Sequence, residues 1–275
     1  MEPQIDGLVE HGATTVAREE GAGALSSCRA QLGLAEGPAN AKWTAFLSFS
    51  SGTSGMPKGV RISHLNPMAN ILQHAAHLRI PTDMEGVKRK AEKREEHLYE
   101  PGKDRMLGLL PFSHIYGLVV VLATSAWLGL GVVCISRFGG IEHLLRSTVR
   151  HRITHWALVP PLLLRLTKEK ALTAPFLPKL KGLVKHTMSG AAPLKDELAR
   201  AFMQRFEGVR LGQGYGATEL CATAIMSPVE GAYVLGSAGC LVPNTEARVV
   251  KADGSEAALG EPGELWVRGP QVTMG

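Results

Sequence analysis

Cysteine is scarce in this chain, and no two cysteines have the spacing of a metal or redox site. The four cysteines among the 275 residues are Cys28, Cys134, Cys221 and Cys240, and none belongs to a C-x-x-C pair. The ten histidines include no H-E-x-x-H motif. We therefore expect ordinary thiols in a reducing compartment, with no structural zinc.

A secretory signal and a membrane span are also lacking. The first six residues are acidic and contain no apolar core region. Residues 107–136 carry no Asp, Glu, Lys or Arg, a length that would fit a transmembrane helix. Pro111, His114 and four glycines interrupt this run, so we expect a buried strand, helix and strand instead. These features predict a cytoplasmic protein.

No single sign of charge dominates the sequence. Lys and Arg number 30 and Asp and Glu 25, giving a net charge of +5, and the two signs are interspersed. This pattern predicts no nucleic-acid partner, whereas a mild positive bias suits an anionic nucleotide. The alternating charges of residues 85–96 favour a solvated helix over a docking surface.

The most informative stretch is residues 50–59, which reads SSGTSGMPKG. Glycines allow backbone amides to approach an anion closely, and successive amides form a concavity that suits phosphate. The hydroxyls add donors, and Lys58 adds a mobile positive charge. The loop is not the common P-loop, because Pro57 stands where that motif has glycine before its lysine. We expect the loop to bind nucleotide phosphates and to end in an extended turn.

Strand and helix signals alternate after this loop, which predicts an α/β fold with a mostly parallel sheet and helices on both faces. The expected strands are 44–49, one ending near residue 110, 132–135, 155–159, 183–188 and 209–213. The expected helices are 64–78, 115–127, 141–151, 161–170 and 194–206, the last with Pro193 in its first turn.

The alternation of strand and helix signals ends after Pro228. Residues 234–235, 245–250 and 263–267 read as strands, and Asp253-Gly254 is a hairpin signal. We therefore divide the chain into an irregular leading segment (1–42), an α/β nucleotide-binding region (43–230) and an incomplete small β subdomain (231–275).

Five motifs in order resemble those of the acyl-adenylate-forming, or AMP-binding, superfamily, which includes acyl-CoA synthetases, 4-coumarate–CoA ligases and luciferases. Besides residues 50–59 they are LPFSHIYG (110–117), SGAAPL (189–194), QGYGATE (213–219) and GELWVRGP (263–270). The resemblance is closest to 4-coumarate–CoA ligases and similar acyl-CoA synthetases. It implies the large domain of the adenylate-forming fold in truncated form, because family members carry a further upstream region and a C-terminal lid domain.

The resemblance implies a ligase that uses ATP and Mg²⁺ to convert a carboxylic acid to an acyl-adenylate and then transfers the acyl group to CoA. As a fragment, the chain is expected to be impaired in full turnover. The alternative is a non-catalytic nucleotide-binding or interaction module derived from that family. No specific protein partner is implied, and a peroxisomal location is also known in the family.

The same resemblance assigns the site residues. The ATP- and AMP-binding set is Ser50, Ser51, Gly52, Thr53, Ser54, Gly55, Lys58, Gly190, Ala191, Ala192, Gln213, Gly214, Tyr215, Gly216 and Thr218. The catalytic set is Thr218, Glu219 and His114, with Glu219 also holding Mg²⁺. The acyl-substrate set is His114, Tyr116 and Met226. Arg137 is either a CoA-phosphate contact or an ordinary surface arginine.

Overall fold

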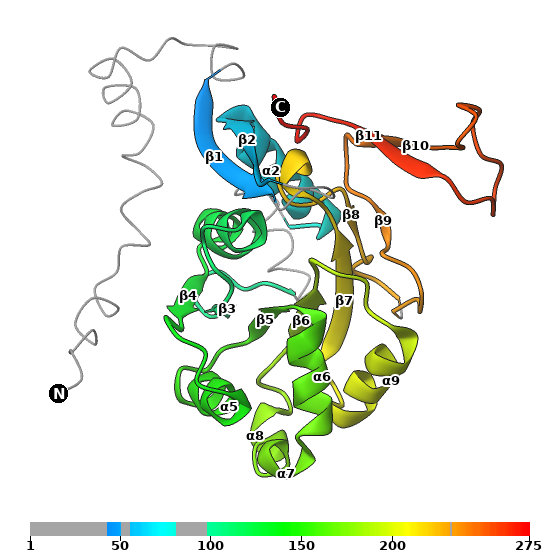
Figure 1. Ribbon diagram of the computed structural model, residues 1–275. Helices are drawn as coiled ribbons and strands as arrows, with labels where there is room; N and C mark the ends of the chain where they lie inside the picture. The colour runs from blue at the N-terminus through cyan, green and yellow to red at the C-terminus, as the bar shows by residue number, and fades with distance from the viewer. Residues whose placement is uncertain (1–42, 51–55, 81–97, 232) are drawn as a thin grey trace, which may run out of the picture.

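The computed structural model describes residues 43–50, 56–80, 98–231 and 233–275, and its course is shown in Figure 1. Three predictions lie outside these described residues. They are the leading segment 1–42, the loop residues 51–55 and the charged segment 85–96.

A seven-stranded sheet forms the centre of the molecule, with the strand order β4-β3-β5-β6-β7-β8-β9. Its first five strands in that order run parallel, and β8 and β9 are added antiparallel. This confirms the mostly parallel sheet. The strands are β3 (Arg105–Gly108), β4 (Gly131–Cys134), β5 (His155–Leu158), β6 (His186–Ser189), β7 (Arg210–Tyr215), β8 (Ile225–Met226) and β9 (Cys240–Leu241).

Helices cover both faces of this sheet, as the alternation of strand and helix signals predicts. One face carries α5 (Ile141–Arg150), α6 (Pro160–Lys168) and α9 (Asp196–Arg205), with the short helices α7 (Lys170–Thr173) and α8 (Leu177–Leu180). The other face carries α2 (Leu65–His77), the π-helix η2 (Tyr116–Ala123) and α4 (Thr124–Leu128).

Neighbouring residues of one strand supply the two cores, because side chains alternate across a sheet. In β3, Leu107 packs in the cluster beneath α5, α6 and α9, and Met106 packs in the opposite cluster. In β5, Leu158 packs in the cluster beneath α5, α6 and α9, and Ala157 packs in the opposite cluster.

The first predicted strand does not belong to the parallel series. β1 (Thr44–Ser50) pairs antiparallel with β2 (Lys58–Ser63) in a sheet of its own. β2 was not predicted, because its opening residues also read as the end of the loop. Val60 and Ile62 alternate with exposed residues and are buried against η2, which is the period of a half-buried strand.

Helix α9 begins at Asp196, so the prediction that Pro193 lies in its first turn is wrong. The amide of Leu194 donates a 2.9 Å hydrogen bond to Oε1 of Gln213. This contact ties the segment before the helix to β7, and the chain turns helical only after it.

The C-terminal region holds a second antiparallel hairpin, formed by β10 (Glu246–Val250) and β11 (Glu264–Arg268). Two of the three predicted strands are thus confirmed, and the strand predicted at 234–235 is wrong, because a turn closes there from the amide of Ser237 to the carbonyl of Val234. A turn does occur at the predicted Asp253-Gly254, where Gly254 has a φ of 84°. The domain boundaries at 42 and 230 stay a prediction.

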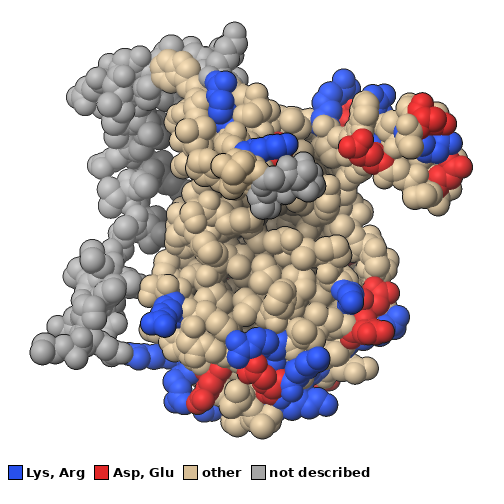
Figure 2. Space-filling model, in the orientation of Figure 1, with Lys and Arg blue, Asp and Glu red and all other residues tan. Residues whose placement is uncertain are grey.

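Charged side chains gather at the lower end of the molecule and on the β10–β11 hairpin in Figure 2, with a largely uncharged surface between them. Both signs occur in each group. The view therefore contains no continuous basic stripe of the kind that tracks a nucleic-acid backbone.

Candidate functional site

A cavity of about 380 Å³ opens beyond the carboxyl ends of β6 and β7. This edge is where open α/β sheets bind their ligands. Four segments that are distant in sequence meet there, and each contains one of the predicted motifs. The lining residues are Phe49, Ser50, His114, Ile115, Tyr116, Val120, Met188, Ser189, Gly190, Ala191, Gly214, Tyr215, Gly216, Ala217, Thr218, Glu219, Ala222, Thr223 and Met226.

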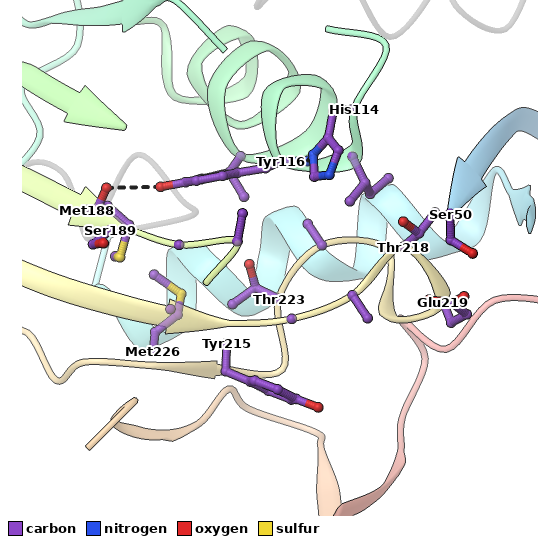
Figure 3. A pocket seen from close by; sticks show the side chains of 18 of the residues that line it. Ser50, His114, Tyr116, Met188, Ser189, Tyr215, Thr218, Glu219, Thr223 and Met226 are labelled. Atoms are coloured by element: carbon purple, nitrogen blue, oxygen red, sulfur yellow. Dashed lines mark hydrogen bonds between the residues drawn. The ribbon is translucent and has the colours of Figure 1, made fainter. Parts of the chain in front are cut away.

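The cavity has a polar end and an apolar end. Figure 3 shows Ser50, Thr218 and Glu219 on one side and Met188 and Met226 on the other. A ligand with a charged head and an apolar tail would match this gradient.

The polar end contains a buried hydroxyl that the protein leaves available. The Oγ atoms of Ser50, at this end, and of Ser189, beside Met188 at the other end, are buried and have no hydrogen-bond partner among the described residues. Buried polar atoms are nearly always paired, so the hydroxyl of Ser50 is free to bond a ligand at the polar end. Ser50 is the last residue of β1 and pairs with Lys58, the first residue of β2. The hairpin therefore sets the two ends of the predicted phosphate loop side by side.

Glu219 is the carboxylate of this end. It lies on a single turn of 3₁₀-helix, η3 (Thr218–Leu220), and its side chain is exposed to the cavity. Its backbone carbonyl accepts a 2.9 Å hydrogen bond from the amide of Thr273. The described residues contain no group of three or more His, Cys, Asp or Glu that could hold a metal ion. One carboxylate still fits Mg²⁺, which keeps waters and takes phosphate oxygens.

Two glycines allow the close approach of backbone that shapes the cavity. A Cβ at Gly216 would lie 1.4 Å from the carbonyl oxygen of Ala222, and a Cβ at Gly190 would lie 3.0 Å from the ring of Tyr116. The backbone after this region is strained, since Cys221 and Ala222 have φ angles of 47° and 99°. Such strain persists where surrounding structure over-determines it, often at functional sites.

Tyr116 supports the apolar end. Its hydroxyl donates a 3.0 Å hydrogen bond to the carbonyl of Met188, drawn as the dashed line in Figure 3. Burial raises the pKa of Tyr116 far above its usual value, so the hydroxyl keeps its proton. Tyr116 is also the first residue of the π-helix η2, an irregularity that is frequent at functional sites.

His114 lies between the two ends. Its Nδ1 accepts a 3.2 Å hydrogen bond from the amide of Tyr116. An accepting Nδ1 places the hydrogen of the neutral ring on Nε2. The exposed ring can therefore donate from Nε2 to a group in the cavity.

The structure gathers most of the described residues assigned from sequence. Eleven of them line the cavity: Ser50, His114, Tyr116, Gly190, Ala191, Gly214, Tyr215, Gly216, Thr218, Glu219 and Met226. Four do not: Lys58, Ala192, Gln213 and Arg137. The side chain of Gln213 instead bonds the amide of Leu194, and Lys58 and Arg137 are exposed.

Several lining residues carried no individual signal. Ser189 stands in a quoted motif, and its position before Gly190 could have identified it. Val120, Met188 and Thr223 reach the cavity through η2, β6 and the turn before β8. Apolar residues in these elements read as ordinary core, so only tertiary packing identifies them.

Burial disfavours ionisation of Cys221, which precedes the lining residue Ala222. Cys221 is fully buried, and burial raises the pKa of its thiol to about 12. The described cysteines Cys134, Cys221 and Cys240 are all free thiols. No helix within the described ranges is long and apolar enough to cross a bilayer.

Comparison with known proteins gives consistent matches. The family model described as AMP-binding enzyme matches residues 6–275. The chain is 34% identical over 236 residues to "Probable 4-coumarate--CoA ligase 1" of Dictyostelium discoideum, covering 85% of this chain and 38% of the relative. It is 35% identical to "4-coumarate--CoA ligase 3" of Arabidopsis thaliana, covering 83% and 38%. The chain therefore spans about two fifths of the length of these relatives.

Solved structures of the same kind share the fold. ATP-bound MatB from Rhodopseudomonas palustris matches with a TM-score of 0.69 and 26% identity, over 84% of this chain and 41% of that one. O-succinylbenzoate CoA synthetase (MenE) from Bacillus subtilis, in complex with ATP and magnesium ion, matches with a TM-score of 0.66 and 28% identity, over 85% and 42%.

Proposed function

The chain belongs to the AMP-binding enzyme family, and we propose that it carries the nucleotide and acyl sites of an acid–CoA ligase. The ligase activates a carboxylic acid with ATP to an acyl-adenylate and passes the acyl group to the thiol of CoA. Because the chain spans only part of its relatives, this activity is proposed for the whole protein to which these residues belong.

One observation carries the proposal. A single cavity joins the unpartnered hydroxyl of Ser50 and the carboxylate of Glu219 at one end to an apolar compartment at the other. An acyl-adenylate has the same division, with a charged nucleotide at one end and an acyl group at the other.

In this proposal the polar end holds the nucleotide. Gly190 and Ala191 line the cavity with little side-chain bulk, which suits a flat base, and Tyr215, which is 43% exposed, offers an aromatic face. Ser50 and Thr218 donate to phosphate oxygens. Residues 51–55, Lys58, Ala192 and Gln213 remain part of the proposed nucleotide site, as the resemblance implies.

The reaction needs positioning and charge neutralisation more than a dedicated base. A carboxylate oxygen of the acid bonds to the α-phosphorus of ATP while the bond to pyrophosphate breaks. The CoA sulfur then bonds to the acyl carbon while the bond from that carbon to the phosphate oxygen breaks, so AMP leaves and the thiol proton passes to solvent. Mg²⁺ neutralises phosphate charge when bound. The chain contributes the Nε2–H of His114 to orient the acid, Glu219 to hold the ion, and Arg137 to contact CoA phosphate.

A second candidate is nucleotide binding without turnover. None of the described residues that line the cavity is Lys or Arg. This lining therefore offers no side-chain cation to a developing negative charge, and such electrostatic stabilisation is a large part of many rate enhancements. The described part of the site is better equipped to bind than to accelerate.

Exchange of labelled pyrophosphate into ATP separates the two candidates. Acid-dependent exchange above the rate without acid supports ligase chemistry. Binding of Mg²⁺–ATP by calorimetry without exchange supports the binding module, and hydrolysis of ATP without any acid contradicts both. Ser50→Ala is expected to weaken ATP binding. Ser255→Ala, on the distant β10–β11 connection, is the matched control. We further propose small-molecule partners and a cytoplasmic location.

A further inference from the structure

A second, smaller cavity lies directly behind the apolar end of the site. It encloses about 20 Å³ and shares Val120, Met188 and Met226 with the main cavity. These three side chains therefore form the partition between the two spaces. A volume of this size holds one water molecule or one hydroxyl oxygen. The other lining residues are His74, Leu78, Tyr99, Met106, Thr124, Ser125, Leu128, Leu130, Trp156, Ala157 and His186.

Two polar atoms of this inner cavity have no partner. Nε2 of His74 and Oγ of Ser125 are buried and make no hydrogen bond to any described residue. Their side chains are only 1% and 0% exposed. An unpaired buried polar atom is costly, and here two of them line the same small space. Other polar groups of the lining are paired, for example Tyr99 with Nδ1 of His186 at 3.4 Å.

The hydrogen-bond pattern assigns the roles of these atoms. The hydroxyl of Thr124 donates to the carbonyl of Val119 at 2.8 Å, so its oxygen can only accept from Nδ1 of His74, 3.5 Å away. Nδ1 then carries the ring hydrogen, and the unpaired Nε2 is left as an acceptor. Burial lowers the pKa of His74 to about 4, which keeps the ring neutral near pH 7. The cavity thus offers one acceptor and one hydroxyl.

Two of the three side chains of the partition are methionines. Methionine side chains are unbranched and have three rotatable bonds, so they adapt to new neighbours. The backbone of Met188 is fixed by the hydrogen bond from Tyr116, and Met226 lies on β8, which is paired on both sides. Rotation of the two methionine side chains would connect the inner cavity to the acyl compartment.

We propose that His74 and Ser125 recognise the far end of the acyl group, and that the preferred acid ends in a neutral hydroxyl. This inference rests on the proposed function and specifies its substrate class. The terminal hydroxyl donates to Nε2 of His74 and accepts from Oγ of Ser125, which satisfies both unpaired atoms at once. A terminal methyl leaves them unpaired.

Charged ends are disfavoured by the same geometry. A terminal carboxylate would meet the lone pair of His74, and a terminal ammonium would be buried where no carboxylate lines the cavity among the described residues. Burying an unpaired charge is far more costly than burying an unpaired hydroxyl. A water molecule could fill the same space, but it would give no preference between acids.

The test measures the binding of matched acids to the full chain by calorimetry. Straight-chain saturated acids of increasing length are compared with their ω-hydroxy counterparts. At the length that reaches the inner cavity, we expect the hydroxy acid to bind about tenfold more tightly, as one added hydrogen bond would give. Ser125→Ala and His74→Leu are expected to bring the affinity ratio of the pair close to one.

His77→Leu is the matched control, because His77 lies on the same helix and bonds the carbonyl of Ser227 instead of lining the inner cavity. The His77→Leu variant should still bind the hydroxy acid more tightly than the saturated acid. Nitrogen NMR gives a second readout in the unaltered chain, where the hydroxy acid should shift the Nε2 signal of His74 and the saturated acid should not.

Three outcomes would overturn the inference. Equal affinities of paired acids at every length show that the cavity holds water only. If the ω-hydroxy acid still binds more tightly than the saturated acid in both Ser125→Ala and His74→Leu, other residues recognise its hydroxyl. Binding of ATP with no binding of any acid refutes the proposed acid site, and the inference with it.

Discussion

The hydroxyl of Tyr116 and the carbonyl of Met188 are joined by a 3.0 Å hydrogen bond across the acyl compartment. This bond links the start of the π-helix η2 to β6, and it holds the ring of Tyr116 against Gly190. The wall of the compartment thus depends on one buried tyrosine.

Tyr116→Phe is therefore expected to destabilise the protein. The change removes the donor of one buried hydrogen bond, which costs about 1 kcal/mol. Urea unfolding should show the loss as a lower midpoint. Tyr233→Phe is the matched control, because the hydroxyl of Tyr233 has no partner among the described residues. Equal losses in both variants would contradict the role of the bond.

Gly216→Ala is expected to disrupt the nucleotide end of the site. The new methyl carbon would lie 1.4 Å from the carbonyl oxygen of Ala222, so the backbone must move, at a cost of about 3 kcal/mol. We expect a lower unfolding temperature in thermal unfolding and a weaker affinity for ATP in calorimetry. Gly131→Ala is the control, since its methyl carbon meets its nearest neighbour, a side-chain carbon of Arg105, at 3.4 Å. If Gly216→Ala binds ATP as tightly as the unaltered chain does, the close approach of Gly216 to the carbonyl of Ala222 is refuted.

Much of the fold follows from local sequence. The elements from β3 to β7 alternate as their apolar runs predict, because a strand buried on both faces must be continuously apolar. The β1–β2 hairpin could not be read in the same way. Lys58–Ser63 is a short strand with Val60 and Ile62 on one face, and its opening lysine and glycine also suit a loop.

The site was predictable where a motif carries it and not where packing alone does. Residues such as Thr218 and Tyr215 stand in recognisable patterns at strand ends, and they line the cavity. His74 and Ser125 lie on helices among apolar residues. They read as ordinary core polar groups until the structure leaves Nε2 of His74 and Oγ of Ser125 without partners in residues that line one space.

Acid pH is expected to destabilise the fold through three buried histidines. Burial lowers the pKa of His74 and His155 to about 4 and of His186 to about 3. In the unfolded chain each titrates near 6.5, so the unfolded state binds more protons once the pH falls below that value. Above pH 6.5 the three histidines do not reduce the free energy of unfolding. As the pH falls from 6.5 toward 4, each histidine lowers that free energy by about 1.4 kcal/mol per pH unit.

Urea unfolding between pH 7.5 and 5 measures this slope. His186→Phe should reduce it by about a third, since one of the three groups no longer binds a proton on unfolding. The exposed His143 serves as control, and His143→Gln should leave the slope unchanged. A stability that is constant across this range would show that the buried rings are already accessible to protons.

Glu219→Gln tests the proposed ion contact. The amide keeps the size of the side chain but loses the negative charge that attracts Mg²⁺. We expect the gain in ATP affinity on adding Mg²⁺ to fall several-fold, with little change in affinity when the ion is removed by chelation. Glu207→Gln is the control, because Glu207 is exposed, pairs with Lys181 and lies outside the cavity. An equal loss with and without Mg²⁺ would show instead that Glu219 positions the nucleotide directly, through the turn that Thr273 holds in place.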